Sequence, residues 1–216
     1  MGYVVYSVKS GDNVYDIANE YKTSIERIIV SNPNINMYRM RPGAKIIVPV
    51  RNVVDTQVSY SSEILEKDIQ NLKLIYPFLE VGEIGKSVLN KSLPYIKIGN
   101  GNKKVFYSAA FHANEWITSL VLMKFLEEYA KAFVENKNIF GHNAQALYYT
   151  TSLYIVPMVN PDGVDLVTGS IKNVEISYKN AVQIANNFPE IPFPDGWKAN
   201  INGVDLKNYQ PICKVL

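Results

Sequence analysis

The chain has 216 residues, of which 47% are hydrophobic and 19% are charged, and its formal net charge at pH 7 is +2. These values are typical of a globular protein with one or two domains, and the small charge gives no basis for a nucleic-acid partner. The single cysteine, Cys213, excludes a disulfide within the chain and a zinc site made of several cysteines. The sequence has no apolar run of the roughly 20 residues that a membrane span needs, and no signal peptide is visible.

The first fifty residues predict the order strand, helix, helix, strand. The alternating pattern of residues 3–8 predicts a short strand. Asn13 and the pair Thr23-Ser24 are placed to cap two helices, because short polar side chains accept hydrogen bonds from the free N–H groups at a helix start. Asn32-Pro33 ends the second helix, since the residue before a proline is disfavoured in the α region. A closing strand follows at residues 46–48.

Motif residues run through this whole segment: Tyr6-Ser7-Val8, Gly11-Asp12-Asn13-Val14, Ile17-Ala18, Tyr21, Asn32-Pro33, Gly43 and Ile47-Val48-Pro49. In this order they resemble the LysM family across residues 1–50. The resemblance implies binding to glycans that contain N-acetylglucosamine, chiefly peptidoglycan. It places the groove between Gly11, Asp12 and Asn13 on one side and the stretch from Tyr38 to Met40 on the other. The alternative is a purely structural module, because most matching positions are core or turn residues.

Residues 51–59 have no helical period and predict a short linker to a second domain over residues 60–216. Apolar spacing then predicts a helix from Ser62 that ends before Pro77. Two strands follow, at 84–88 and 95–98, and Asn90 lies where their connecting turn needs a left-handed residue.

Further along, residues 105–110 and 153–158 have the composition of buried strands, and a long helical pattern lies between them. Alternating strands and helices indicate an α/β fold with a mixed, mainly parallel sheet. The overall prediction is therefore a small βααβ module followed by an α/β domain.

The stretch Phe111-His112-Ala113-Asn114-Glu115-Trp116 lies where a predicted strand turns into a helix. Ligands of open α/β sheets gather at the carboxyl ends of strands. His112 and Glu115 can converge on one ion there, and both residue types are common zinc ligands. By itself the His-x-x-Glu pattern is weak, and the alternative is a capping histidine with an acidic residue in the first turn of the helix.

Later motifs add context in chain order: Val156-Pro157-Met158-Val159-Asn160-Pro161-Asp162-Gly163, Trp197-Lys198-Ala199-Asn200 and Asn202-Gly203-Val204-Asp205-Leu206. Together with the His-x-x-Glu stretch they resemble the zinc carboxypeptidase family over about residues 60–206. Members that also carry a LysM module resemble γ-D-glutamyl-diamino acid endopeptidases, which cut the stem peptide of peptidoglycan.

This resemblance implies a Zn²⁺ cofactor and assigns roles to residues at matching positions. His112 and Glu115 would be two of three zinc ligands. Asp205 would accept the other ring N–H of His112 and so fix its tautomer. Lys198 would stabilise the oxyanion with a single charge rather than a bidentate fork. Asn160 would be a structural residue beside the site.

The chain departs from the family after Leu206. The third zinc ligand, a histidine, and the general-base glutamate of the family both belong beyond the sequence given. His142, in a Gly-His-Asn loop, precedes the Asn160 motif and is expected to lie on the surface, and Cys213 has no support from the family. We therefore expect a truncated domain with exposed apolar edges, no activity from this polypeptide alone, and a frameshift or premature stop as the cause.

Three functions stay open at this stage. The first is a zinc peptidase acting on peptidoglycan stem peptides, represented by its front part. The second is a non-catalytic peptidoglycan-binding protein that works only through LysM, and the third is a product that does not fold. The expected location is the bacterial cell wall, or the cell interior during sporulation or wall recycling.

Overall fold

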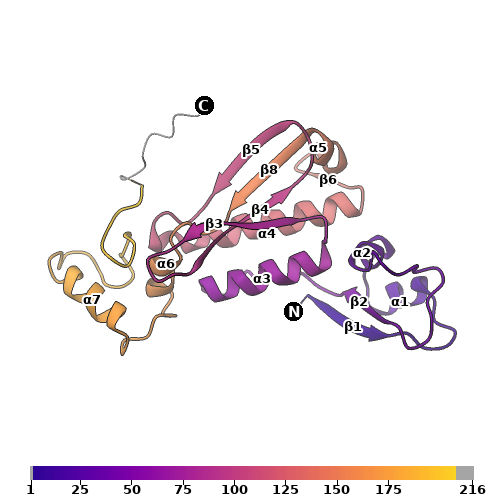
Figure 1. The fold of residues 1–216 in the computed structure, drawn as a ribbon, viewed down its shortest axis with the longest axis horizontal. Coiled ribbons are helices and arrows are strands. Elements are labelled where there is room, and N and C mark those ends of the chain that lie inside the picture. The colour runs from indigo at the N-terminus through magenta and orange to yellow at the C-terminus, as the bar shows by residue number, and fades with distance from the viewer. Residues whose placement is uncertain (1, 208–216) are drawn as a thin grey trace.

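The computed structural model describes residues 2–207 (Figure 1). The N-terminal module, residues 2–50, lies at one end of the long axis, and helix α7 (Ile176–Ala185) lies at the other. The sheet of the C-terminal domain, residues 60–207, occupies the middle.

The N-terminal module has the predicted order: β1 (Tyr3–Ser7), α1 (Val14–Glu20), α2 (Ile25–Ser31) and β2 (Lys45–Pro49). The two strands pair antiparallel, with Tyr3 opposite Pro49. Both predicted helix starts are confirmed, because Asn13 accepts from the Asp16 N–H and Ser24 accepts from the Arg27 N–H. Their apolar faces close over one small core: Val8, Val14, Ile17, Ala18, Ile28, Met37, Ile46 and Val48.

Asn32 links the second helix of this module to the closing strand. Its Nδ2 donates to the Ile28 carbonyl at 2.7 Å and to the Ile47 carbonyl at 2.8 Å, while its Oδ1 accepts from the Ile47 N–H at 2.8 Å. The side chain is 6% exposed. It therefore ends α2, as the following proline indicates, and also satisfies backbone groups at the edge of β2 that would otherwise be buried without partners.

The central sheet of the C-terminal domain contains β3 (Glu80–Lys86), β4 (Ser92–Ile98), β8 (Thr151–Val156) and β5 (Lys103–Ser108), in that spatial order. The mixed α/β class is confirmed. The expectation of mainly parallel pairing is wrong for these strands, because β3–β4 and β4–β8 are antiparallel and β5–β8 alone is parallel. The reason is local: β3 and β4 form a hairpin whose turn contains Asn90 at φ 62°, as predicted.

Helix α3 (Ser62–Ile75) precedes the sheet, and η1 (Ala113–Glu115, a short 3₁₀ helix), α4 (Trp116–Val134) and α5 (Ala144–Thr150) lie between β5 and β8 in the chain. Helices α6 (Pro161–Val167) and α7 follow β8, and Ala181 of α7 packs in a separate apolar cluster with Leu166 and Trp197. Apolar residues of α3, α4, β4 and β8 share one core, in which Leu72, Ile98, Leu126 and Ile155 are fully buried. A small hairpin, β6 (Asn138–Ile139) with β7 (His142–Asn143), places His142 on the surface, as expected.

Strand β5 differs from its prediction. It was expected to be buried, yet Phe106 is 62% exposed and Tyr107 is 48% exposed. The strand stands at the edge of the described sheet, so its outer side has no neighbouring strand among residues 2–207. Ile117 and Val121 of α4 are also 48% and 62% exposed. Apolar side chains are therefore exposed on this part of the described domain.

The predicted linker, residues 51–59, is irregular but firmly packed. Val53 and Val54 are 8% and 2% exposed and belong to the core of the C-terminal domain. Their backbone N–H groups donate to the buried Glu127 carboxylate of α4, at 2.5 and 3.3 Å, and Lys124 neutralises that carboxylate at 3.0 Å. Beside this segment, Ser31 of α2 donates to the Ile75 carbonyl at 2.8 Å. The two domains are therefore in direct contact.

Candidate functional site

The candidate metal site begins at the turn between β5 and η1. Ala110 takes a left-handed conformation, at φ 49°, which costs a non-glycine residue on the order of 1 kcal/mol. Its N–H donates to Thr118 Oγ1 at 2.9 Å, and its carbonyl accepts from the Asn160 N–H at 3.0 Å. These bonds hold the strained backbone and direct the next residues away from the sheet.

His112 and Glu115 come together at this turn. His112 precedes η1 with an extended backbone, and the 3₁₀ turn brings the residue three positions later alongside it. His112 Nδ1 lies 2.9 Å from Glu115 Oε1, and His112 Nε2 lies 3.6 Å from Asp205 Oδ1. The His112 side chain makes no capping hydrogen bond to η1, so the helix-capping alternative has no support in this geometry.

The pair has the chemistry of part of a zinc site. An imidazole nitrogen and a carboxylate oxygen face each other at hydrogen-bond distance, and both atom types are common zinc ligands. Asp205 stands at the opposite ring nitrogen, where a carboxylate fixes the tautomer of a ligating histidine. Within residues 2–207 no group of three or more His, Cys, Asp or Glu side chains is placed to hold a metal. Among the described residues, His112 and Glu115 are thus the two predicted ligand side chains that come together.

Asn160 ties three chain segments together behind this pair. It is 2% exposed, its Oδ1 accepts from the Gly163 N–H at 3.1 Å, and its Nδ2 donates to the carbonyls of Phe111 and Ala199 at 3.2 and 3.0 Å. Gly163 has to be a glycine, because an added Cβ would lie 2.6 Å from the Ala199 carbonyl oxygen. The Asn-Pro-Asp-Gly motif thus fixes the position of the turn that carries His112.

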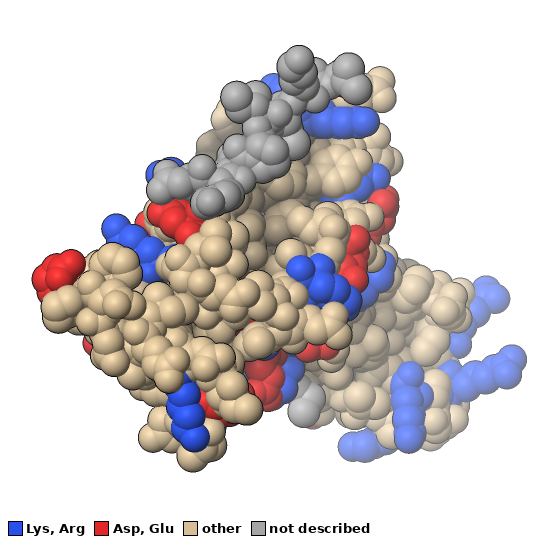
Figure 2. Space-filling view, turned by 60° about the vertical axis from the view of Figure 1, so that its left-hand side comes forward, with Lys and Arg blue, Asp and Glu red and all other residues tan. Residues whose placement is uncertain are grey.

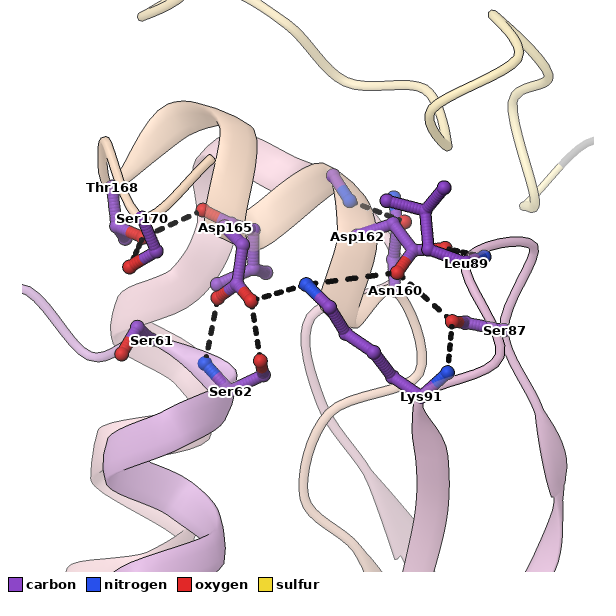
Figure 3. Close-up of polar contacts among 12 residues, drawn as sticks. Ser61, Ser62, Ser87, Leu89, Lys91, Asn160, Asp162, Asp165, Thr168 and Ser170 are labelled. Carbon is purple, nitrogen blue, oxygen red and sulfur yellow. Dashed lines mark hydrogen bonds and ion pairs between the residues drawn. The ribbon is translucent and has the colours of Figure 1, made fainter. Parts of the chain in front are cut away.

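An ionic network anchors the helix that follows Asn160 (Figure 3). Asp162 accepts from Ser87 Oγ and from the Leu89 N–H, both at 2.9 Å. Asp165, one turn later, accepts from the Ser62 N–H at 2.7 Å and from its hydroxyl. Lys91 reaches both carboxylates, at 2.5 Å from Asp165 and 3.8 Å from Asp162. Sequence reasoning missed these roles, although the acidic spacing on α6 was visible.

Lys198 contacts η1 through its backbone carbonyl and also lines a cavity. Its carbonyl accepts from the Ala113 N–H at 3.0 Å, so its stretch runs beside η1. Its side chain is exposed and lines a cavity of about 610 Å³, together with Asn114 and Asp205. Neither His112 nor Glu115 lines this cavity.

In the N-terminal module, the predicted loop residues Gly11, Asp12 and Asn13 are engaged in shaping the loop. Asp12 Oδ2 accepts from the Lys9 N–H at 2.7 Å and from the Tyr6 hydroxyl at 2.8 Å, and these bonds lower the pKa of the Asp12 carboxyl. The hydrogen bond that the Tyr6 hydroxyl donates to Asp12 raises the pKa of Tyr6 to about 12. Asn13 caps α1, and Gly11 adopts φ 89° with open space beside it.

The other side of the predicted groove carries an exposed aromatic pair. Tyr38 is 64% exposed and Tyr15 is 55% exposed, with ring centroids 6.3 Å apart. Met40 is half-buried against the module core. The sequence analysis did not single out Tyr15. Its place on α1, outside the apolar face formed by Val14, Ile17 and Ala18, could have shown that this ring is exposed.

No helix in the described residues is long and apolar enough to cross a membrane. The family model for zinc carboxypeptidase matches residues 65–210, and the model for the LysM domain matches residues 6–49.

Two curated relatives match most of the chain. Gamma-D-glutamyl-L-diamino acid endopeptidase 1 of Lysinibacillus sphaericus is 44% identical over 165 residues, which cover 74% of this chain and 39% of that protein. The uncharacterized protein YqgT of Bacillus subtilis (strain 168) is 38% identical over 160 residues, covering 73% and 42%. The chain spans about two fifths of the length of these relatives.

Among solved structures, bovine thrombin-activatable fibrinolysis inhibitor in complex with tick carboxypeptidase inhibitor aligns at 20% identity with a TM-score of 0.46. The alignment covers 67% of this chain and 38% of that chain. The assignment rests on the family model, which matches more than half of the chain. The protein belongs to the zinc carboxypeptidase family and carries a LysM domain at residues 6–49.

Proposed function

We propose that this protein is the front part of a zinc peptidase that acts on the stem peptides of peptidoglycan and is held to the wall by its LysM domain. The observation that carries the proposal is the His112–Glu115 pair, backed by Asp205, at the end of β5. The family supplies the metal and the reaction class. The relative from L. sphaericus, by its name, suggests the γ-D-glutamyl-diamino acid bond as the bond cleaved.

His112 Nδ1 and Glu115 Oε1 would hold the zinc ion. A bound zinc would polarise a scissile carbonyl and acidify a water molecule. Asp205 would keep the proton of His112 on Nε2, which leaves the Nδ1 lone pair free for the metal. Lys198 would place a positive charge near an anion formed beside the site. Asn160 would preserve the geometry by holding Phe111 and Ala199 in place.

The 216-residue polypeptide by itself is proposed to be catalytically incomplete. A catalytic zinc in this type of site uses three protein ligands and one open position, and residues 2–207 bring two together. Two ligands alone retain zinc weakly. Cys213 lies outside the described residues.

A second candidate function is glycan binding without catalysis. The observation that favours it is the exposed Tyr15–Tyr38 pair on a domain with its own closed core. Aromatic rings on a rigid surface can stack against the apolar faces of sugar rings. In this reading LysM would be the working part of the chain, and the peptidoglycan partner would be the same.

The test of the metal assignment is zinc retention, measured by competition with a chromophoric chelator at pH 7.5. We expect weak binding of one zinc by the chain, with a dissociation constant near the micromolar range. His112→Ala and Glu115→Gln each weaken it by at least about tenfold. His142→Ala is the matched control, because this histidine lies on the surface in β7, and it leaves binding unchanged.

Equal binding by the parent chain and the His112→Ala variant would remove the metal assignment. Zinc-dependent hydrolysis of γ-D-glutamyl-L-lysine by the parent chain would refute catalytic incompleteness while leaving the ligand assignment intact. Binding to insoluble peptidoglycan by a protein that retains no zinc would favour the second candidate function.

A further inference from the structure

The turn that carries His112 and Glu115 lies toward the end of the molecule that holds α7. Ala113, inside the turn, is fully buried and packs in one apolar cluster with Trp197. Figure 2 brings this end forward and shows a mostly uncharged surface there with a few charged side chains around it. The hydrogen bonds to the backbone of the turn likewise come from amide, carbonyl and hydroxyl groups. Its geometry therefore depends on short-range contacts between uncharged groups.

One hydroxyl group connects the start of this turn to its end. Thr118 Oγ1 accepts a hydrogen bond from the Ala110 N–H at 2.9 Å and donates one to the Glu115 carbonyl at 2.7 Å. Ala110 begins the turn in its left-handed conformation, at φ 49°, and Glu115 is the last residue of η1. A short side chain in this place has to accept and donate through one atom, which a hydroxyl does and a methyl group cannot.

Loss of this hydroxyl would release both ends of the turn. Ala110 is 2% exposed, so its N–H would be left buried without its acceptor. A strained backbone persists only where the surrounding contacts enforce it. Ala110 would then relax toward an ordinary conformation, and the relaxation would turn His112, two residues later, away from Glu115.

We propose that Thr118 is a positioning residue whose hydroxyl sets this turn so that His112 and Glu115 meet, and its relevance to zinc rests on the proposed function. Both of its hydrogen bonds go to backbone atoms, so it acts on the two side chains through the turn. Its own side chain is exposed, so a substitution removes little core packing. Alanine also favours a helix more than threonine does, so Thr118→Ala should keep α4 while it separates the pair.

The test measures nuclear Overhauser contacts between the His112 ring and the Glu115 side chain in the metal-free protein. Their Nδ1 and Oε1 atoms lie 2.9 Å apart, so the parent chain should show cross-peaks between protons of the two side chains. The chain has two histidines, and a His142→Ala variant assigns the ring signals. The variants are Thr118→Ala, Thr118→Val and Thr118→Ser. Ser119→Ala is the matched control, because Ser119 is the next residue of α4 and its buried hydroxyl has no hydrogen-bond partner among the described residues.

We expect the cross-peaks to weaken or disappear in Thr118→Ala and Thr118→Val, which lack the hydroxyl. Thr118→Ser restores it and should keep the cross-peaks, as should Ser119→Ala. Zinc affinity, measured by the chelator competition, should fall by about tenfold in the two variants without the hydroxyl and stay within about twofold of the parent in the other two. Far-UV circular dichroism should show the same helix content in all four.

Cross-peaks that persist without the hydroxyl, or that are lost equally in Thr118→Ser or Ser119→Ala, would overturn the inference. If Thr118→Ala does not fold, the comparison of Thr118→Val with Thr118→Ser decides the matter in the same way. Failure of the proposed function gives a different result: zinc binding would not depend on His112, while the cross-peaks would still vanish without the Thr118 hydroxyl. Zinc retention through His112 that is indifferent to Thr118 would leave the peptidase proposal standing and remove the role of Thr118.

Discussion

Replacement of Lys91 by methionine tests how strongly the ionic network of α6 holds the site in place. Lys91 Nζ lies 2.5 Å from Asp165 and 3.8 Å from Asp162, and the two carboxylate side chains are 5% and 2% exposed. Methionine keeps most of the aliphatic stem but leaves two buried negative charges one helical turn apart. Removing one partner of a fully buried ion pair costs about 3–5 kcal/mol.

The expected cost here is smaller, about 2–3 kcal/mol, for two structural reasons. Lys91 is 29% exposed, so water already screens part of its interaction. Asp162 and Asp165 also keep hydrogen bonds from Leu89, Ser87 and Ser62 after the lysine is gone. With a urea m-value of about 2 kcal/mol/M, the unfolding midpoint would fall by about 1–1.5 M.

The assay is urea unfolding at pH 7, followed by far-UV circular dichroism. The matched control is Lys67→Met, which breaks an ion pair with Glu63 at 2.6 Å whose side chains are 65% and 72% exposed. That variant should leave the urea midpoint essentially unchanged, because water screens so exposed an ion pair. Equal shifts of the two variants, or a shift below about 0.5 kcal/mol for Lys91→Met, would refute the view that this network anchors α6.

Two further predictions concern other parts of the chain. Burial raises the pKa of Asp68 to about 6, so its contribution to stability is fully present below about pH 4 and is lost as the pH rises through about 6. Asp68→Asn keeps an acceptor for the Tyr60 hydroxyl at 2.8 Å and should be about 1–3 kcal/mol more stable than the parent at pH 8. Parallel stability curves from pH 4 to 8 would contradict this assignment. In the LysM domain, Tyr15→Ser and Tyr38→Ser should each reduce retention on insoluble peptidoglycan severalfold in a pull-down assay, whereas the same change at exposed Tyr149 should not; unchanged retention in both LysM variants would exclude the aromatic pair from the glycan surface.

Local patterns were sufficient for much of the fold. The caps Asn13 and Ser24, the left-handed Asn90 and the apolar spacing of α3 each depend on neighbours close in sequence, and each prediction is confirmed. The convergence of His112 and Glu115 could also be predicted, since a single turn joins them. Their roles as zinc ligands stay a prediction.

Features that depend on distant residues could not be predicted in this way. Composition marked β5 as buried, but burial of Phe106 depends on whether another element covers it, and an edge position leaves it exposed. The pairing of Glu127 with Val53 joins residues 74 positions apart, and no periodic pattern encodes such a contact. The cavity of about 610 Å³ beside Lys198 likewise brings together residues of η1, α7 and the loops after α7, with no regular spacing in the sequence.

The hydrogen bonds from the backbone of Val53 and Val54 to Glu127 limit how far the two domains can move relative to each other. A flexible tether would let a wall-bound protein sample many bonds around its anchoring point. Here the connection is buried and hydrogen-bonded, and Ser31 adds a contact between the two domains. The LysM domain and the His112 turn are therefore held in a fixed arrangement within one rigid molecule (Figure 1). If the chain binds glycan and acts on stem peptides as proposed, this fixed arrangement would limit which stem peptides can reach the His112 turn.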